Sequence, residues 1–346
     1  MSVELRWRRQ TLHLRRRFAT SQGGIDSKET LVLEIEHEGL TGLGEAAPSR
    51  LYGQSLEQCE AAFAALRDEL RDVSPFAIEA TLARALAAHD SQRAAVAALD
   101  SALHDWVAKR LGVPVWRLLG LNRPSVQTCY TIGVAEPAET REKIREALAA
   151  GFRTLKVKVG VDSDEQTLAA VRAEFDGPLL LDANEAWSPA VASGRVRALA
   201  RFSPTMIEQP LARRDWPALK ELRELRVAPI FVDESCERPA DVVRLQGSVD
   251  GVNVKFTKCG GTREALRMVA LARGLGMGAM LGCFVSSSLA IAPALAIAPL
   301  FDHCDLDGAL LLANDTFRGI RHERGRLDAS DEPGLGLCAA GPADAK

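Results

Sequence analysis

Short apolar segments that each end in a charged residue recur along the middle of the chain at a nearly constant interval. Five such ends lie 22 to 26 residues apart, by subtraction of their numbers, at Lys158, Asp182, Glu208, Asp233 and Lys255. A strand of about five residues, a helix of about 10 to 14 and two short loops fill one such interval. The pattern therefore predicts successive strand–helix units whose parallel sheet is buried on both faces.

The same spacing continues on both sides of this region. Residues 127–133 read as an earlier strand, and residues 278–283 and 302–305 read as two later strands. Eight strand–helix units close into a barrel whose catalytic groups lie at the carboxyl ends of the strands. We therefore expect an α/β fold, a (β/α)8 TIM barrel over residues 123–316, with three carboxylates and at least two lysines at its mouth.

Residues 1–122 lack this rhythm and indicate a separate α+β domain. Residues 31–35 and 40–45 predict an antiparallel hairpin, and three helices are expected between residues 55 and 111. Arginines near the start interleave with apolar residues, which favours a solvated strand face over a polyanion site. Residues 317–346 have too little pattern for another unit, and we expect them to complete the first domain as a cap on the barrel.

Composition argues against several classes of function. The 346 residues carry a formal net charge of −3, with a pI near 6.1, which is unfavourable for a nucleic-acid partner. The longest apolar run, residues 289–301, is interrupted by two prolines and is too short to span a bilayer. Seven cysteines without a CxxC pair indicate reduced thiols. Without a recognisable signal peptide, we expect a cytoplasmic protein that has no membrane partner.

Three carboxylates follow three consecutive predicted strands. Asp182, Glu208 and Asp233 should converge at the barrel mouth, where they would repel one another unless a cation lay between them. Oxygen ligands suit a hard ion such as Mg²⁺. One such carboxylate alone would more simply cap a helix or pair with an arginine. Three in register favour a metal site.

Lysines flank these carboxylates on both sides. Lys156 and Lys158 are two apart on one strand and therefore point to the same face, and Lys255 lies beyond the carboxylate strands. A lysine acts as a general base when its pKa falls towards neutrality, which burial and a neighbouring ammonium both promote. A salt bridge to a metal carboxylate is a competing role for Lys255. Together the residues indicate removal of a proton next to a substrate carboxylate, and a lysine on each face would invert a stereocentre.

At this point the sequence resembles the enolase superfamily, in its muconate-lactonizing subgroup, and most closely the dipeptide epimerases typified by L-Ala-D/L-Glu epimerase. The resemblance covers nearly the whole chain. The motifs that carry it are Gly44-Glu45, Leu51-Tyr-Gly-Gln-Ser55, Ala98-Leu-Asp-Ser-Ala-Leu-His-Asp105, Leu155-Lys-Val-Lys158, Leu181-Asp-Ala-Asn184, Ile207-Glu-Gln-Pro210, Val232-Asp-Glu-Ser235, Asn253-Val-Lys-Phe-Thr-Lys-Cys-Gly-Gly261, Met280-Leu-Gly-Cys283 and Cys304-Asp-Leu-Asp-Gly308.

The resemblance implies a Mg²⁺-dependent dipeptide epimerase that inverts the α-carbon of the C-terminal residue through a metal-stabilised enediolate. It implies one Mg²⁺ per subunit and a homo-oligomer, as is common in the subgroup. Carried over to this sequence, the implied roles are metal binding by Asp182, Glu208 and Asp233; acid/base catalysis by Lys158 and Lys255; substrate binding by Asp305, Asp307, Lys156 and Cys283; and support by Asn184 and Lys258. The Asp305/Asp307 pair would bind the free α-ammonium of the dipeptide.

One departure concerns specificity. The Ala-Glu epimerases carry an arginine for the glutamate side chain on a flexible loop that corresponds to residues 18–28, and no arginine follows Phe18 here. Without this arginine, either Lys28 binds the glutamate carboxylate in its place or the substrate is another dipeptide. Alternative functions are an o-succinylbenzoate synthase, an N-acylamino acid racemase or a muconate-type cycloisomerase of the same superfamily. A non-catalytic barrel is a third hypothesis, which the complete set of carboxylates and lysines opposes.

Overall fold

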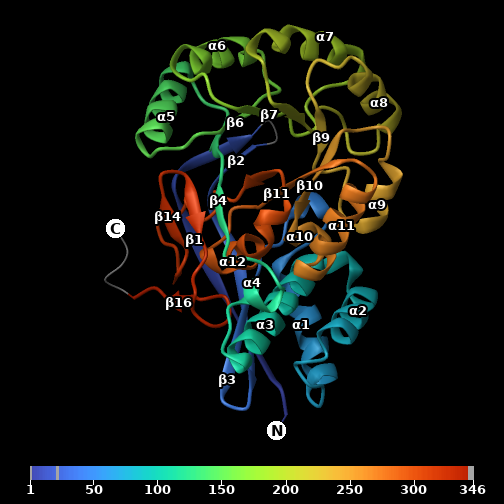
Figure 1. Cartoon of the computed structure of the whole chain (residues 1–346), viewed down its shortest axis with the longest axis vertical. Helices are drawn as coiled ribbons and strands as arrows, with labels where there is room; N and C mark the ends of the chain where they lie inside the picture. Colours follow the sequence, from blue (N-terminus) through green and yellow to red (C-terminus); the bar gives the residue numbers. More distant parts are fainter. Residues whose placement is uncertain (1, 21–22, 342–346) are drawn as a thin grey trace.

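The computed structural model describes residues 2–20 and 23–341. An eight-stranded parallel sheet forms its centre, with the strands arranged in chain order from β5 to β12. Each strand is short and buried, as the apolar segments predicted, and the sheet curls into a nearly closed barrel (Figure 1). Its strands are β5 (Tyr130–Ile132), β6 (Leu155–Lys158), β7 (Leu179–Asp182), β8 (Met206–Glu208), β9 (Ile230–Val232), β10 (Gly251–Lys255), β11 (Gly278–Gly282) and β12 (His303–Asp305).

Helices connect these strands and cover the outside of the barrel, which confirms the predicted TIM-type fold. In order they are α5 (Pro137–Ala149), α6 (Asp164–Glu174), α7 (Pro189–Leu199), α8 (Trp216–Glu224), α9 (Pro239–Arg244), the single turn α10 (Phe256–Cys259), α11 (Thr262–Gly274) and α12 (Ser288–Ile297). The eighth unit differs from the expectation. Its strand β12 is present, but no helix follows it within the described residues.

The first predicted strand is in fact two strands. Residues 125–127 form β4 (Ser125–Gln127), which pairs with β15 (Arg326–Asp328), and only β5 belongs to the barrel. The break occurs where the main-chain N–H of Thr128 turns to the carbonyl of Gly325, 2.9 Å away. Cys129 N then donates to Cys304 O at 3.1 Å, which joins β5 to β12 across the seam of the barrel.

Side chains inside the barrel form two layers. Because alternate residues of a strand point to the same face, an inward apolar residue is followed two positions later by an inward polar one. Leu180, Met206 and Phe231 belong to a small buried apolar cluster in the barrel interior, together with Cys129 and Met280. Two positions further along their strands lie the three predicted metal carboxylates. The barrel interior therefore has an apolar layer, and a charged layer lies above it at the carboxyl ends of the strands.

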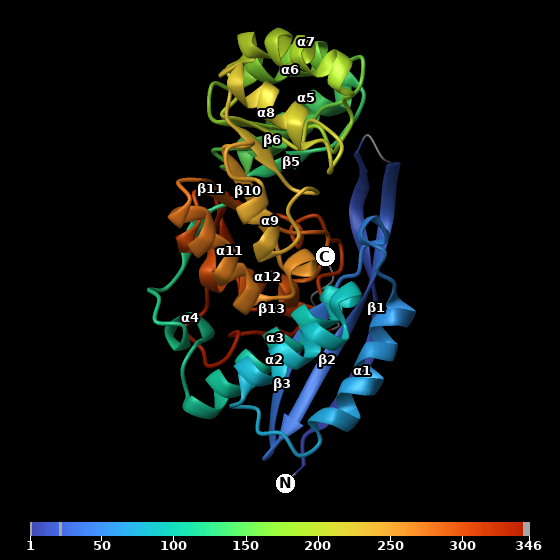
Figure 2. The same ribbon diagram turned by 90° about the vertical axis from the view of Figure 1, so that its right-hand side faces the viewer.

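The N-terminal domain is an antiparallel sheet packed against three helices, as Figure 2 shows. The sheet contains β1 (Glu4–Thr20), β2 (Gly23–His37) and β3 (Leu40–Ala46), and the helices are α1 (Leu56–Leu70), α2 (Ile78–Ala88) and α3 (Arg93–Leu111). Arginines of β1 pair with acids at the surface, for example Arg9 with Glu60 at 2.6 Å, as expected for a solvated strand face. The region expected as a flexible loop, residues 18–28, is instead the paired end of the β1–β2 hairpin, apart from residues 21 and 22, which lie outside the described residues.

The C-terminal segment returns to the first domain, as predicted. It contains β13 (Phe317–Arg318), β14 (Arg321–Glu323), β15 and β16 (Cys338–Ala339). Leu335 N donates to Asp105 Oδ1 of α3 at 2.7 Å, and Trp116 Nε1 of the short helix α4 (Val115–Leu118) donates to Ser330 O at 3.0 Å. The exact domain boundaries stay a prediction. All seven cysteines are free, and the described part of the chain has no helix long and apolar enough to cross a membrane.

Two glycines of β3 let the sheet approach α3 closely. A Cβ atom on Gly44 would lie 2.0 Å from Ala98 O, and one on Gly42 would lie 2.1 Å from Ala102 O. Both neighbours are helix backbone and cannot rotate away. The glycine-rich stretch therefore serves packing within the cap.

We expect Gly44→Ala to lower the free energy of unfolding by about 1–3 kcal/mol, the usual range for overpacking. Urea denaturation would measure it. Gly194→Ala in α7 is the matched control, because nothing lies within 4 Å of the added methyl. There the loss of backbone freedom in the unfolded chain should leave stability unchanged or raise it by up to about 1 kcal/mol. Equal stability of the two variants would contradict the close approach.

Candidate active site

Lys156 is the centre of the charged layer at the barrel mouth. Its Nζ lies 3.0 Å from Asp182 Oδ2, 2.8 Å from Glu208 Oε2 and 2.8 Å from Asp305 Oδ2. The lysine is 1% exposed, and its partners come from three different strands. Burial acts to lower the pKa of Lys156, but Asp182, Asp305 and Glu208 together raise it well above the usual value. One ammonium thus bridges the predicted metal site and the predicted ammonium site.

The two predicted acid/base lysines lie on opposite sides of the mouth. Lys158 comes from β6 and Lys255 from β10, which are four strands apart in an eight-stranded barrel. Lys158 Nζ lies 2.6 Å from Asp182 Oδ2, and Lys255 Nζ lies 2.7 Å from Asp233 Oδ2 and 4.7 Å from the centre of the Phe284 ring. The mouth between the two ammonium groups is where a reacting carbon could sit.

The expectation of a lowered lysine pKa is wrong for Lys255 in this arrangement. Burial does act to lower the pKa of Lys255, but the direct ion pair with Asp233 outweighs it and the pKa rises. The salt bridge to a metal carboxylate, which the sequence analysis gave as the competing role for Lys255, is the contact found here. A proton can leave this lysine more easily only when Asp233 shares its charge with another cation.

Asp233 is held by a second, fully buried lysine. Lys258 Nζ donates to Asp233 Oδ1 at 2.5 Å and to three main-chain carbonyls, those of Asp233, Cys236 and Asn253. Lys258 is 0% exposed, so it fixes the strand ends from within. The Asn253 side chain in turn donates to Glu208 Oε1 at 2.7 Å.

Gly282 makes room for this network. A Cβ atom at position 282 would lie 2.6 Å from Asn253 Oδ1 and 2.8 Å from Lys255 Cε. The absent side chain therefore lets Lys255 and Asn253 lie against β11. The role of a glycine at this strand end was not apparent from the sequence.

The Asp305/Asp307 pair lies at the seam between β12 and β5. Asp305 is fully engaged: besides Lys156, its Oδ1 accepts from Thr131 Oγ1 at 3.3 Å and from Cys129 Sγ at 3.1 Å. Asp307 Oδ2 accepts from Thr131 N at 2.8 Å, and no cation pairs with Asp307 among the described residues. Burial and the neighbouring Asp305 raise the pKa of Asp307 to about 7.

A cavity of about 800 Å³ lies between this charged mouth and the cap. Both acid/base lysines, both seam aspartates and Cys283 line its barrel side. The cap contributes the end of the β1–β2 hairpin and residues 48–57, with the apolar side chains Phe18, Ile25 and Leu51 among them. The predicted site residues are therefore brought together, with Lys258 behind them.

Arg213 attaches the cap loop to the barrel. Its Nη1 donates to Leu51 O at 3.1 Å, its guanidinium lies 5.5 Å from the centre of the Tyr52 ring, and Glu185 holds its Nη2 at 2.7 Å. Gln54 Nε2 adds a bond of 3.1 Å to Thr257 O. These contacts close the cap side of the cavity.

Comparison with known proteins identifies the family. The N-terminal domain profile of the mandelate racemase / muconate lactonizing enzyme family matches residues 2–120, and the enolase C-terminal domain-like profile matches residues 139–340. The chain belongs to the mandelate racemase/muconate lactonizing enzyme family. The two family profiles thus correspond to the cap and to the barrel.

Several relatives within this family are dipeptide epimerases. The hydrophobic dipeptide epimerase of Roseobacter litoralis is 40% identical over 335 residues, which cover 94% of this chain and 96% of the relative. The L-Ala-D/L-Glu epimerase of Bacteroides thetaiotaomicron is 36% identical over 334 residues, covering 94% and 85%. The crystal structure of the dipeptide epimerase from Enterococcus faecalis V583, complexed with Mg and the dipeptide L-Leu-L-Tyr, has a TM-score of 0.93 at 32% identity and covers 97% of this chain and 99% of that one.

The charges of the family site favour a divalent cation. Six carboxyl groups gather here with four lysines, so two acids have no lysine partner. These ten residues are Asp182, Glu208, Asp233, Glu234, Asp305 and Asp307 with Lys156, Lys158, Lys255 and Lys258. Within the described residues no three ligating groups converge on one point, because lysines hold Asp182 and Asp233. The donors are all oxygen, which is the chemistry that Mg²⁺ requires. The residue set therefore fits the ion once these two carboxylates turn from their lysines.

Glu234 is a member of this site that the sequence analysis missed. Asn184 Nδ2 donates to its Oε1 at 3.2 Å, while its Oε2 is buried and has no hydrogen-bond partner among the described atoms. Burial and the neighbouring Asp233 and Asp182 raise the pKa of Glu234 to about 8. Its position directly after Asp233 was the available signal, although alternation within a strand would put neighbouring side chains on opposite faces. The strand β9 ends at Val232, so alternation no longer applies there.

Lys258→Met should lower the free energy of unfolding by about 3 kcal/mol or more, because it leaves buried oxygens without their cation. Lys220→Met is the control. Lys220 lies on α8 with its side chain 60% exposed, and its pair with Glu224 is 4.0 Å long, so the change should be under about 1 kcal/mol. Chemical denaturation of both variants checks the difference. A Lys258 variant as stable as the Lys220 variant would show that Asp233 does not depend on this lysine.

Proposed function

We propose that this chain is a Mg²⁺-dependent dipeptide epimerase that inverts the α-carbon of the C-terminal residue. The observation that carries the proposal is the pair of buried lysines, Lys158 and Lys255, on opposite sides of one cavity. Between them lies space for a planar intermediate, and beside them lies an acidic pair suited to an ammonium group. The names of the relatives support the same substrate class.

The two lysines supply the proton transfers. A neutral Nζ on one face would take the α-proton, and the ammonium on the other face would return a proton to the same carbon. Mg²⁺ held by Asp182, Glu208 and Asp233 would supply positive charge beside the substrate carboxylate and so make the α-proton more acidic. Sharing Asp233 with this ion would also weaken its hold on the proton of Lys255. This accounts for a lysine base in a site that otherwise favours ammonium.

The Asp305/Asp307 pair would bind the N-terminal ammonium of the dipeptide. Asp305 already faces Lys156, whereas Asp307 has no cationic partner among the described residues. We therefore assign the larger share of ammonium binding to Asp307. An acylated substrate has no ammonium to offer, so an unpaired Asp307 disfavours the N-acylamino acid racemase and o-succinylbenzoate synthase alternatives.

The cap side of the cavity favours an apolar side chain on the C-terminal residue. Ile25 and Leu51 are 40% and 37% exposed and line the cavity together with Phe18. Lys28, the candidate substitute for the missing arginine, donates its Nζ to Pro48 O. Burial lowers its pKa, with the Arg50 charge acting in the same direction. A hydrophobic side chain is thus better matched to this wall than the carboxylate of glutamate.

Incubation in D₂O with Mg²⁺ and a dipeptide library tests the proposal. We expect deuterium at the α-carbon of the C-terminal residue, read by mass spectrometry, with apolar residues ahead of glutamate. Lys158→Ala and Lys255→Ala should each slow inversion by about 10² to 10⁴-fold, the usual contribution of a general acid or base. Each variant should still exchange the α-proton of one epimer only, because the remaining lysine reaches one face. Lys220→Ala serves as the control and should behave like the unaltered protein.

Two results would contradict the epimerase assignment. One is the absence of exchange with every dipeptide in protein that binds Mg²⁺. The other is inversion at the normal rate in either lysine variant.

The seam aspartates give a separate test. Asp307→Asn should raise KM for a free dipeptide about tenfold or more, since a charge-assisted hydrogen bond is lost. It should leave Mg²⁺ affinity, measured by calorimetry, unchanged. Asp305→Asn should alter both the KM for the dipeptide and the Mg²⁺ affinity, because Lys156 would lose one partner and turn towards Asp182 and Glu208. Identical behaviour of the two variants would contradict this division of roles.

A further inference from the structure

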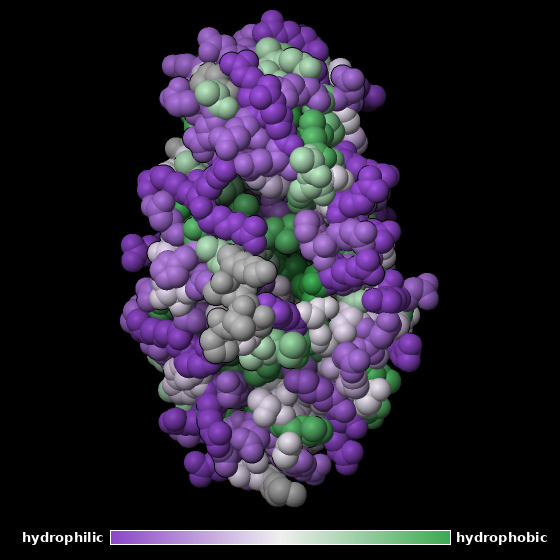
Figure 3. Space-filling model, turned by 90° about the vertical axis from the view of Figure 1, so that its left-hand side faces the viewer, coloured by the Kyte–Doolittle hydropathy of each residue, from purple (hydrophilic) through white to green (hydrophobic). Residues whose placement is uncertain are grey.

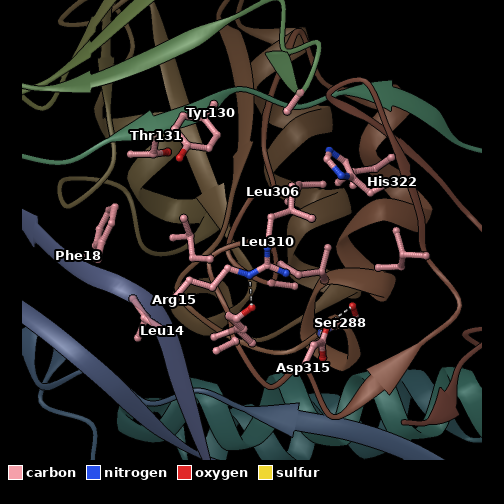
Figure 4. A pocket seen from close by; sticks show the side chains of 18 of the residues that line it. Leu14, Arg15, Phe18, Tyr130, Thr131, Ser288, Leu306, Leu310, Asp315 and His322 are labelled. Carbon is pink, nitrogen blue, oxygen red and sulfur yellow. Dashed lines mark hydrogen bonds between the residues drawn. The ribbon is translucent and has the colours of Figure 1, made fainter. Parts of the chain in front are cut away.

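A second cavity, of about 870 Å³, lies on the outside of the barrel where β5 and β12 meet. Each earlier strand is followed by a helix, but none follows β12 in the described chain. The outer face of this seam is covered instead by β1, by residues 306–315 and by the C-terminal segment (Figure 4). The molecule is hollowed on the side where β1 and β14 lie, with hydrophobic residues inside a hydrophilic surround (Figure 3).

The walls of this cavity combine apolar and polar side chains. Tyr130 and Phe152 form part of the wall, with their rings 5.1 Å apart, and eight leucines and isoleucines supply much of its apolar part. These aliphatic residues are Leu14, Ile291, Leu306, Leu310, Leu311, Leu312, Ile320 and Leu327. A pocket of this size and character is typical of sites for small organic molecules.

Most charged side chains at the cavity already have partners. Arg16 pairs with Glu146 at 2.8 Å, Lys143 with Glu139 at 2.8 Å and Arg17 with Asp26 at 2.8 Å. Asp315 caps the N-terminus of α12, where its Oδ2 accepts from Ser288 Oγ at 2.5 Å. These groups are therefore already engaged within the protein.

Arg15 differs from these groups. Its backbone N–H donates to Leu311 O at 2.9 Å and its Nε donates to Leu312 O at 2.8 Å, which fixes the direction of the side chain. Arg15 is an exposed residue whose guanidinium points into the cavity towards Leu310 and Leu306 (Figure 4). No carboxylate pairs with it within residues 2–20 and 23–341. The terminal nitrogens thus offer two donors in a fork that matches a carboxylate.

We propose that this outer cavity is a binding site for a small carboxylate with an apolar body, whose carboxylate pairs with Arg15. The positive charge that would hold the carboxylate is that of Arg15, because Arg16, Arg17 and Lys143 are paired with carboxylates of the protein. The leucine-rich wall takes the apolar part. A cation would not pair with Arg15, and a strongly polar ligand would not match the leucine-rich wall.

The site adjoins the candidate active site without sharing its chemistry. Phe18, Thr131 and Leu311 line both cavities. Thr131 also holds both seam aspartates, through its N–H and its hydroxyl. A ligand in the outer cavity would therefore pack against the strand that positions Asp305 and Asp307. Its binding can be measured whether or not the chain epimerises dipeptides.

Calorimetric titration of the full chain, loaded with Mg²⁺, with octanoate tests the inference. Octanamide is the matched neutral probe. We expect octanoate to bind with one site and octanamide to bind about 10- to 100-fold more weakly, the range for a lost charged hydrogen bond. Arg15→Gln should weaken octanoate by the same factor and leave octanamide unchanged. Arg8→Gln is the control, because Arg8 is an exposed residue of the same strand outside both cavities.

A second variant separates the outer cavity from the charged mouth, which could also attract a carboxylate. Leu310→Trp keeps Arg15 but places a larger side chain beside it, so it should weaken octanoate binding in protein that unfolds at the same temperature as the unaltered chain. Octanoate binding that survives both Arg15→Gln and Leu310→Trp would place the ligand elsewhere and overturn the proposal. Equal affinities for octanoate and octanamide would overturn it as well.

Discussion

A buried layer of opposite charges at the barrel mouth is the interaction on which the rest of the structure depends. Lys156 contacts Asp182, Glu208 and Asp305 within 3.0 Å, and none of the four is more than 5% exposed. An isolated buried charge costs several kcal/mol, so each of these groups is tolerable only beside its partners. The partners come from β6, β7, β8 and β12, at opposite ends of the sheet order. The barrel has to curl and nearly close for the charges to meet, and the apolar layer below holds it in that shape.

The same layer is incomplete in a way that suits catalysis. Six carboxyl groups share four lysines, and burial together with neighbouring carboxylates raises the pKa of Glu208, Glu234 and Asp307. A stable core would have matched the charges within the chain. A site that binds a divalent cation and an ammonium group instead needs carboxyl groups that no lysine of the chain neutralises. The imbalance is therefore better explained as preparation for ligands than as a device for stability.

Much of the barrel and of its charged mouth could be predicted from the sequence because both follow from local regularities. Strand spacing places Lys158, Asp182, Glu208, Asp233 and Lys255 at one end of a parallel sheet, and no tertiary information is needed. What could not be predicted depends on contacts between distant segments. Thr128 turns to a carbonyl of the C-terminal segment and so divides the first predicted strand in two. Likewise the ion pair that raises the pKa of Lys255 requires knowing how the side chains orient, beyond which strands carry them.

Cap and barrel contribute different kinds of side chain to the cavity, apolar ones from the cap and buried charges from the barrel. Cap residues at the cavity attach mainly through main-chain groups: Lys28 donates to a carbonyl of its own domain, and Arg213 of the barrel donates to the carbonyl of Leu51. Side chains such as Ile25 can therefore change without disturbing a charge that the barrel needs. The barrel residues have less freedom, because removing a lysine takes an ion-pair partner from at least one buried carboxylate. In a family built this way, substrate preference should diverge through the hairpin and residues 48–57 while the charged layer stays the same.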